Sequence, residues 1–319
     1  MNRIVVVGSI NVDIVSRIKQ YPVPGETIKS ESTEIHYGGK GANQAVAAAL
    51  SGGDVTIIGA VGSDPYGQDL IRSLQGHGVD TSMVTRKPGT SGMAYIMVEA
   101  SGQNIIVLAE GANGKLMPDD ARLEAGKDTG GILVLQNEIP WATNESVIRR
   151  ARSCGMSVIF NPAPAVKIPK DELPLIDTLI LNESETEYIT GRAIGGKNDA
   201  ELAARQLLDG GVGEIIVTMG ALGSLYMNSN GASVYTPARK VKAVDTTSAG
   251  DTFIGCYAAE LCAGKQVEEA LQYASAAAAI AVTRKGAQSS IPTRDEVEHF
   301  MKLANGESGD AGETDESNH

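Results

Sequence analysis

Short runs of apolar, mostly β-branched residues alternate along the chain with stretches whose apolar residues recur at helical spacing. The apolar runs indicate buried strands at Ile4–Val7, Val55–Ile58, Ile132–Leu135, Val158–Phe160, Thr178–Leu181 and Ile215–Thr218. Helical patterns lie near residues 42–51, 66–76, 143–153, 199–209, 249–263, 267–282 and 294–304. This alternation predicts a three-layer α/β domain, in which helices cover both faces of a mostly parallel central sheet.

Two segments, 10–37 and 93–108, depart from this pattern. In both, apolar and polar residues alternate, and no crossover helix accompanies them. Strands of this kind leave one face polar, so we predict a small accessory β-sheet that acts as a lid. Since no linker divides the chain, residues 1–304 are predicted to form a single domain that includes this lid.

The charge balance restricts the partners. The chain has 319 residues and a formal net charge of −12, which argues against nucleic acid or an anionic membrane surface as the main partner. Residues 305–319 contain five acidic residues, no Lys or Arg, and no apolar periodicity. We therefore predict an acidic, disordered tail without a catalytic role.

The cysteines and apolar runs indicate the compartment. Cys154, Cys256 and Cys262 show no metal-ligand spacing, which favours buried, reduced thiols. The N-terminal apolar run ends at Gly8, too early for a secretory signal, and the stretch Ala276–Val282 is far shorter than a membrane span. A soluble cytoplasmic protein is expected.

Two loops that lead into helices are candidates for chemistry, because open parallel sheets bind ligands at the carboxyl ends of their strands. The first is GGKGANQA, residues 38–45, whose glycines allow close approach of a ligand. Lys40 and Asn43 could then hold hydroxyls or a phosphate. A plain helix entry with a solvated lysine explains the local composition equally well.

The second loop spans residues 244–253, VDTTSAGDTF. Small residues at 248–250 begin a long helix, and the free N–H groups of such a helix start suit a phosphoryl group. Asp251 could accept a proton from an attacking alcohol. Spacing alone does not exclude the alternative that Asp251 only stabilises the helix dipole.

Two other nucleotide-binding patterns are missing. Residues 191–198 approach the pattern GxxxxGK[ST], but Asn198 replaces the hydroxyl residue and a helical stretch precedes the loop. No GxGxxG is present, so a nicotinamide-binding fold lacks its fingerprint.

With both loops considered, the chain resembles the ribokinase family of carbohydrate kinases. The loops at 38–45 and 245–253 match the two signatures of that family. Further matches occur in the family's order from residue 3 to about 304; they are GSINVD at 8–13, NPAPA at 161–165, NESE at 182–185, VTMG at 217–220 with Gly223, and RKGAQ at 284–288 with SIP at 290–292.

The resemblance implies roles for individual residues in sugar binding and catalysis. The implied sugar ligands are Asn11, Asp13, Gly39, Lys40, Asn43 and Glu138, although a surface glutamate remains an alternative for Glu138. Asp251 corresponds to the catalytic base, and the amides of Ala249, Gly250 and Asp251 would steady the γ-phosphoryl group. The family most often has Gly where Ser248 stands, and its motif tolerates Ser.

The resemblance also implies nucleotide and ion sites. The nucleotide residues would be Asn182, Glu185, Thr218, Gly220, Gly223, Gly250 and Ser275, with Asn182 and Glu185 helping to organise Mg²⁺. A solvated helix position remains an alternative for Glu185. A monovalent activator, usually K⁺, would lie at Asp245, Thr247, Ala281, Arg284, Gly286 and Ser290.

The implied reaction is transfer of the γ-phosphoryl group of ATP to the 5-hydroxyl of D-ribose. Alternatives are a kinase for 2-deoxyribose, another pentose or a nucleoside, and a non-catalytic sugar sensor. The intact Asp251 loop and the nucleotide motifs argue against a sensor. The resemblance further implies a homodimer formed through the lid strands.

Overall fold

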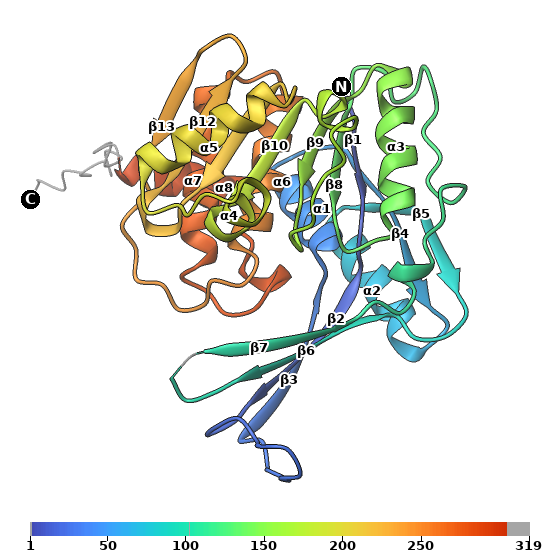
Figure 1. The fold of residues 1–319 in the computed structure, drawn as a ribbon. Helices are drawn as coiled ribbons and strands as arrows, with labels where there is room; N and C mark the ends of the chain where they lie inside the picture. Colours follow the sequence, from blue (N-terminus) through green and yellow to red (C-terminus); the bar gives the residue numbers. More distant parts are fainter. Residues whose placement is uncertain (1, 102, 305–319) are drawn as a thin grey trace, which may run out of the picture.

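The structure, a computed structural model, describes residues 2–101 and 103–304 (Figure 1). Its larger sheet has nine strands in the order β13-β12-β11-β10-β9-β8-β1-β4-β5. Neighbouring strands from β5 to β11 are parallel, whereas β12 and β13 are antiparallel. The strands are β1 (Ile4–Val7), β4 (Val55–Gly62), β5 (Asp80–Lys87), β8 (Ile132–Gln136), β9 (Ser157–Asn161), β10 (Thr178–Asn182), β11 (Glu214–Thr218), β12 (Ser224–Asn228) and β13 (Ser233–Thr236).

The strands missed by the sequence prediction are the two edge strands of the large sheet and one strand beside an edge. β1 has the predicted bounds, and β4, β8, β9, β10 and β11 extend the predicted runs by one to four residues. The missed strands are β5, β12 and β13. β5 and β13 are only partly buried, so they lack the continuous apolar run typical of a central parallel strand.

Helices cover both faces of the large sheet, which confirms the three-layer α/β prediction. Buried side chains of α1, α2, α6, α7 and α8 pack with Ile4 and Val6 on one face, and those of α3 and α5 pack with Val5 and Val7 on the other. The helices are α1 (Lys40–Leu50), α2 (Pro65–Gly76), α3 (Trp141–Cys154), α4 (Glu183–Thr190), α5 (Lys197–Asp209), α6 (Ala249–Cys262), α7 (Val267–Ala281) and α8 (Arg294–Ala304).

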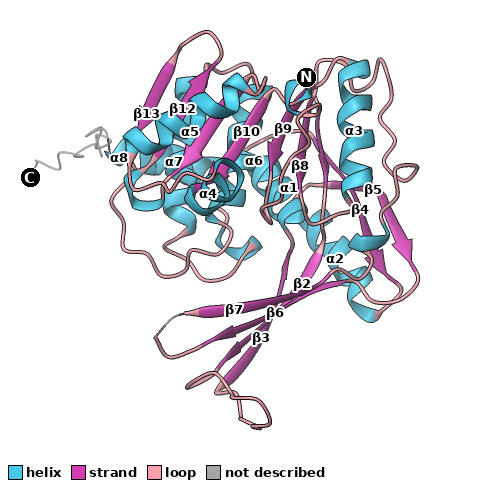
Figure 2. Cartoon of the chain, viewed as in Figure 1, coloured by secondary structure: helices cyan, strands magenta, loops and turns pink. Residues whose placement is uncertain are grey.

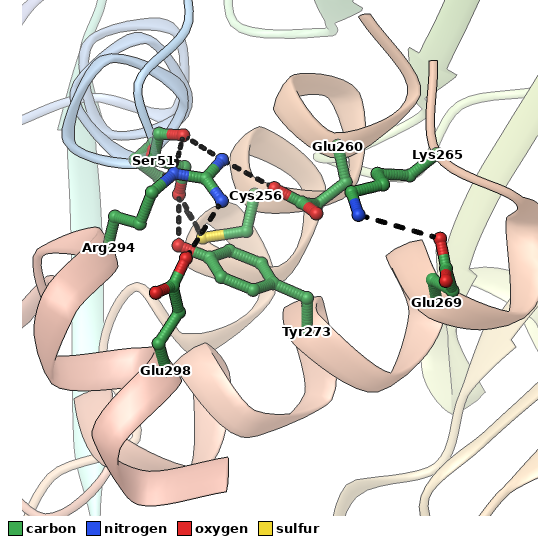
Figure 3. A network of polar contacts seen from close by, with 9 residues as sticks. Ser51, Cys256, Glu260, Lys265, Glu269, Tyr273, Arg294 and Glu298 are labelled. Carbon is green, nitrogen blue, oxygen red and sulfur yellow. Dashed lines mark hydrogen bonds and ion pairs between the residues drawn. The ribbon is translucent and has the colours of Figure 1, made fainter. Parts of the chain in front are cut away.

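A polar network joins four helices on the first of these faces (Figure 3). Arg294 of α8 donates through Nε to the carbonyl of Ser51 at the end of α1 (2.9 Å) and through Nη2 to buried Glu260 of α6 (2.5 Å). The guanidinium lies 5.1 Å from the ring centre of Tyr273 of α7. Arg294 thus holds the ends of α1 and α6 in register far from their first turns.

A four-stranded lid sheet stands apart from the large sheet (Figure 2). Its order is β3-β2-β6-β7, and β2 and β6 pair in parallel although they come from distant segments. The strands are β2 (Asn11–Arg17), β3 (Ser32–Gly38), β6 (Gly92–Val98) and β7 (Asn104–Ala109). The predicted accessory sheet is therefore confirmed, whereas the predicted tail, 305–319, lies outside the described residues.

Two further features bear on the sequence predictions. Cys154 and Cys256 are buried free thiols, whereas Cys262 is partly exposed and departs from the predicted burial because it ends α6 at the surface. In residues 2–101 and 103–304, the helices are all too short or too polar to cross a lipid bilayer.

Candidate active site

The carboxyl ends of the parallel strands and the first turns of α1 and α6 meet at one edge of the large sheet. They enclose a cavity of about 190 Å³. Residues from three of the predicted sets line it together; they are Lys40 from the first loop, Asn182, Glu185 and Thr218 from the nucleotide set, and Ser248, Gly250 and Asp251 from the second loop, with Asn161 and Thr246 beside them.

Asp251 is held by two side-chain amides from α1. The carboxylate is 7% exposed, and it accepts a hydrogen bond from Asn43 Nδ2 at 3.1 Å and another from Gln44 Nε2 at 2.9 Å. A solvated acid at a helix start would not need such partners. The geometry therefore favours a functional carboxylate over one that only stabilises the helix dipole. It also shows that Gln44, which the resemblance does not imply, contacts Asp251.

The loop before Asp251 adopts a special backbone conformation. Ser248 has a φ of 64°, in the left-handed region that residues with side chains seldom adopt. Its carbonyl accepts from Thr252 N at 2.8 Å, which starts α6. The Ala249 N–H donates to Thr246 O at 3.3 Å, whereas Gly250 and Asp251 occupy the first helical turn, where N–H groups lack helical partners.

Asp13 lies on β2 of the lid sheet and is 8% exposed. Burial, and after it the negative charges of Glu138 and Asp251, raise the pKa of its carboxyl to about 7, against the lowering effect of Lys40. Asp13 is therefore poised to gain or lose a proton near neutral pH.

Lys40, at the first position of α1, is the cation in this acidic cluster. Burial lowers the pKa of its ammonium group, but four surrounding carboxylates outweigh burial and raise that pKa above its ordinary value; they belong to Asp251, Glu138, Glu185 and Asp13. The ammonium group consequently stays charged and offsets part of the negative charge around the cavity.

Glu138 lies in the loop after β8 and is drawn into the site by three donors. Its Oε2 accepts from Ser9 Oγ at 2.5 Å, from the Lys40 backbone N–H at 3.2 Å and from Asn11 Nδ2 at 3.4 Å. These bonds place Glu138 beside Asn11 and Lys40, two of the sugar-binding residues that the resemblance implies. They disfavour the alternative of a solvated surface glutamate.

Asn113 is a site residue that the sequence analysis missed. Its Nδ2 donates to Asn11 Oδ1 at 2.6 Å, and its Oδ1 accepts from the Ile10 N–H at 3.0 Å, so it fixes the Asn11 side chain. Asn113 belongs to a short 3₁₀ turn, Asn113–Lys115, outside every recognised motif. No sequence signal marked it.

Asn182 and Glu185 form a capping box at the start of α4. Asn182 Oδ1 accepts from Glu185 N at 2.8 Å, and Glu185 Oε2 accepts from Asn182 N at 3.0 Å and from Asn161 Nδ2 at 3.3 Å. Burial, opposed by these hydrogen bonds and by Lys40, raises the pKa of the Glu185 carboxyl. Glu185 is thus buried and hydrogen-bonded, contrary to the alternative of a solvated helix position.

The remaining nucleotide residues lie outside the 190 Å³ cavity. Gly220 begins the 3₁₀ turn Gly220–Leu222 that follows β11, Gly223 comes directly after that turn, and Ser275 is partly buried on α7. The structure therefore brings Thr218 into the cavity but leaves these three residues beyond its lining.

The predicted monovalent-cation residues divide into two groups. Asp245 accepts from Thr247 N at 2.9 Å and from Gly286 N at 3.0 Å. Burial raises the pKa of its carboxyl, but hydrogen bonding to the side chain and backbone of Thr247 and to Gly286, with the charge of Arg17, lowers that pKa below its ordinary value. Asp245, Thr247 and Gly286 line a second cavity of about 280 Å³ against the lid, whereas the others do not. Arg284 pairs with Glu296 at 2.6 Å, Ser290 Oγ donates to Ala287 O at 2.7 Å, and Ala281 is buried.

In residues 2–101 and 103–304, no three His, Cys, Asp or Glu side chains lie in an arrangement that could hold a metal ion by themselves.

The fold and this arrangement of loops define a class of α/β enzymes, the small-molecule kinases with a β-sheet lid. The chain matches the pfkB family carbohydrate kinase over residues 1–294, and it belongs to that family. The family resemblance drawn from the two loops is thereby confirmed.

Individual relatives cover almost the whole chain. A ribokinase of Haemophilus influenzae is 41% identical, over 94% of this chain and 98% of its own, and a deoxyribokinase of Salmonella typhimurium is 39% identical, over 94% and 99%. A solved structure of an Arabidopsis thaliana ribokinase complexed with ribose and ATP has a TM-score of 0.86 and 33% identity, over 94% of this chain and 99% of that one.

Proposed function

We propose that this protein transfers the γ-phosphoryl group of ATP to the 5-hydroxyl of D-ribose, giving D-ribose 5-phosphate and ADP. The observation that carries the proposal is the buried Asp251 carboxylate, held by α1 amides at the first turn of α6 on the rim of the cavity. The ribokinase names of relatives from Haemophilus influenzae and Arabidopsis thaliana support the sugar substrate.

The proposed sugar ligands are Asn11, Asp13, Gly39, Lys40, Asn43 and Glu138. The Oδ1 atom of Asn43 is buried and has no hydrogen-bond partner among the described residues, so it offers an acceptor to a sugar hydroxyl. The ionised Asp13 carboxylate would accept from hydroxyls in charge-assisted hydrogen bonds. A site built from buried polar groups discriminates against analogues that lack a hydroxyl, because those groups would lose their partners.

In the proposed chemistry, Asp251 takes the proton of the sugar 5-hydroxyl while that oxygen attacks the γ-phosphorus of ATP and ADP leaves. A loose phosphoryl-transfer transition state needs positioning and charge stabilisation more than a strong base. The Ala249, Gly250 and Asp251 amides, with the dipole of α6, would stabilise the negative charge on the transferring group. The Lys40 ammonium group would add to this stabilisation.

The proposed nucleotide residues are Asn182, Glu185, Thr218, Gly220, Gly223, Gly250 and Ser275. The oxygen atoms of Glu185 and Asn182 are hard ligands, few in number, and suit Mg²⁺, which keeps several waters and phosphate oxygens. When bound, Mg²⁺ would neutralise charge on the phosphates. Since both side chains are already hydrogen-bonded, we propose that they act mainly through water.

For the monovalent activator we propose K⁺ near Asp245, Thr247, Ala281, Arg284, Gly286 and Ser290. Asp245 already links the loop before α6 to the loop at Gly286 through two backbone N–H groups. A cation bound to carbonyls at this link would stiffen the second loop without touching the sugar.

The proposed homodimer forms through the outer face of the lid sheet. Strand register places Ile14, Ile35, Tyr95 and Val107 side by side on one face, with Ile105 next to them. Ile35, Tyr95, Ile105 and Val107 are between 44% and 55% exposed. The opposite face, with Asp13 and His36, lines the second cavity, so the apolar face is left for a second copy of this chain.

The first experiment measures ADP release from Mg-ATP with D-ribose, 2-deoxyribose or adenosine, each with and without K⁺. Preference for ribose and stimulation by K⁺ are expected. Preference for 2-deoxyribose is the second candidate, favoured by the Salmonella typhimurium relative, and it would keep the mechanism while changing the substrate. Ribose binding without ADP release would indicate a sensor and overturn the proposal.

A further inference from the structure

A chain of buried side-chain amides connects the central sheet to Asp251. Gln136, at the end of β8, donates through Nε2 to Gln44 Oε1 at 2.7 Å, and Gln44 of α1 donates through Nε2 to Asp251 Oδ1 at 2.9 Å. Both glutamines are fully buried. Three elements that are distant in sequence are thus linked by two consecutive hydrogen bonds.

The direction of this chain follows from Asp251. An ionised carboxylate only accepts hydrogen bonds, so Gln44 must turn its NH₂ group toward Asp251 and its oxygen toward Gln136. Gln136 must then present its own NH₂ group to Gln44. Each amide orientation is consequently dictated by the carboxylate at the end of the chain.

The chain leaves one polar atom unsatisfied. Gln136 Oε1 is buried without a hydrogen-bond partner in the described part of the chain, and it packs so closely on Gly8 that a Cβ atom there would lie 2.0 Å from it. An apolar side chain of equal length at position 136 would avoid this orphaned oxygen. Packing therefore does not explain the presence of Gln136, whereas the orientation of Gln44 does.

We infer that Gln44 and Gln136 are positioning residues that hold the Asp251 carboxylate toward the sugar, an inference that rests on the proposed role of Asp251 as base. Gln44 fixes Oδ1, which leaves Oδ2 beside Asn43 and the cavity. Gln136 does not contact Asp251 and acts through its hydrogen bond to Gln44. If the NH₂ group of Gln136 is removed, the Gln44 amide can rotate. Its oxygen then turns toward Asp251 and displaces the carboxylate.

The test compares Gln44→Met and Gln136→Met with the wild-type protein. Both substitutions keep side-chain length and remove the amide. For Gln44→Met we expect kcat to fall roughly 10- to 100-fold, because a hydrogen bond to a charged group is lost, and for Gln136→Met roughly 3- to 10-fold. KM for ribose and for ATP should stay within about twofold, since neither residue lines the cavity.

Thermal unfolding separates positioning from packing. Gln136→Met should keep or raise the Tm while kcat falls, because it removes the orphaned oxygen. The control is Thr143→Val on α3, which removes an equally buried hydrogen bond, from Thr143 Oγ1 to Leu116 O, and should lower the Tm without changing kcat. If Gln136→Met lowers kcat only in proportion to lost folded protein, the inference is wrong.

Crystal structures of the wild-type protein and Gln44→Met give a readout that needs no activity. The Asp251 carboxylate should rotate away from its wild-type position, and an unchanged carboxylate would overturn the inference. This result stands even if the wild-type protein phosphorylates no pentose, so failure of the positioning role and failure of the proposed function are distinguishable. Should Gln44→Met not fold, the structure of Gln136→Met decides in the same way.

Discussion

The side-chain nitrogen of Asn43 lies 3.1 Å from Asp251 Oδ2, which joins two residues 208 positions apart in the chain. The bond connects the first turn of α1 to the first turn of α6. Under the proposed function it places a sugar ligand and the catalytic base in direct contact, so substrate binding and proton transfer depend on one another.

Asp251→Asn keeps the size of this side chain but removes the proton acceptor. We expect kcat to fall about 10³-fold, within the range attributed to a general base. The affinity for ATP, measured by calorimetry, should change little. Asp209→Asn, at the exposed end of α5, is the control. Retained turnover in Asp251→Asn would exclude the assigned role.

Ribose affinity should depend on pH through Asp13. Its pKa of about 7 means that the carboxylate that accepts sugar hydroxyls is mostly protonated at pH 6 and mostly ionised at pH 8. We expect the Kd for ribose to be roughly tenfold weaker at pH 6 than at pH 8. Calorimetry on Asp13→Asn should show weak binding with little pH dependence, and a similar slope in that variant would contradict the prediction.

The Asp13 carboxyl also makes the stability of the folded protein depend on pH. Because the folded pKa is raised above the unfolded value of 3.8, the folded state binds more protons between these values, and its stability falls as pH rises toward and through about 7. Asp13→Asn should therefore raise the Tm at pH 8, and the gain should shrink at pH 5. A gain that grows toward acid would have the wrong sign.

Gly92→Ala should weaken ribose binding although it replaces none of the predicted sugar ligands. A Cβ atom at position 92 would lie 2.1 Å from both Asn11 Oδ1 and Asn113 Nδ2, so it must displace the Asn11 side chain. We expect KM for ribose to rise by about tenfold or more. Gly76→Ala on α2, where a Cβ atom meets nothing within 4 Å, is the matched control. Equal KM values for the two variants would argue against a role for Asn11.

Arg294→Met should destabilise the protein and leave its chemistry intact. The substitution leaves Glu260, whose side chain is 5% exposed, without its ion-pair partner, at a cost of roughly 2 to 4 kcal/mol. Arg72→Met breaks an exposed ion pair with Asp69 and should cost less than about 0.5 kcal/mol. Chemical denaturation measures both. Equal losses would show that the network of Figure 3 contributes little.

Val107→Asp should dissociate the proposed dimer, because it places a charge in the outer apolar face of the lid sheet. Ile106→Asp is the control. Ile106 is next to Val107 in the chain and equally exposed, at 55%, but its side chain lies on the opposite face of the lid sheet. Light scattering should report a monomer for Val107→Asp and a dimer for Ile106→Asp. If both variants and the wild-type protein have the same mass, the outer face of the lid sheet does not form the dimer interface.

Much of the fold followed from local pattern. Continuous apolar runs predicted the central strands β1 and β8, since a strand buried on both faces leaves no room for polar residues. The edge strand β5 was missed, because a half-exposed strand has a weaker periodic signal. The small residues of the loops at 38–45 and 248–250 marked the helix starts that line the cavity, since small residues are needed where a ligand approaches the backbone.

The layer architecture, the accessory sheet and the two loops could be predicted from the sequence, because each depends on residues close together in the chain. Three relationships could be found only in the folded chain: Asn113 fixes Asn11, burial and neighbouring carboxylates raise the pKa of Asp13 to about 7, and Gln136 donates to the Gln44 amide that holds Asp251. The hydrogen bonds and like charges in these relationships join residues between 92 and 238 positions apart, which become neighbours only when the sheet, the lid and the helices pack together.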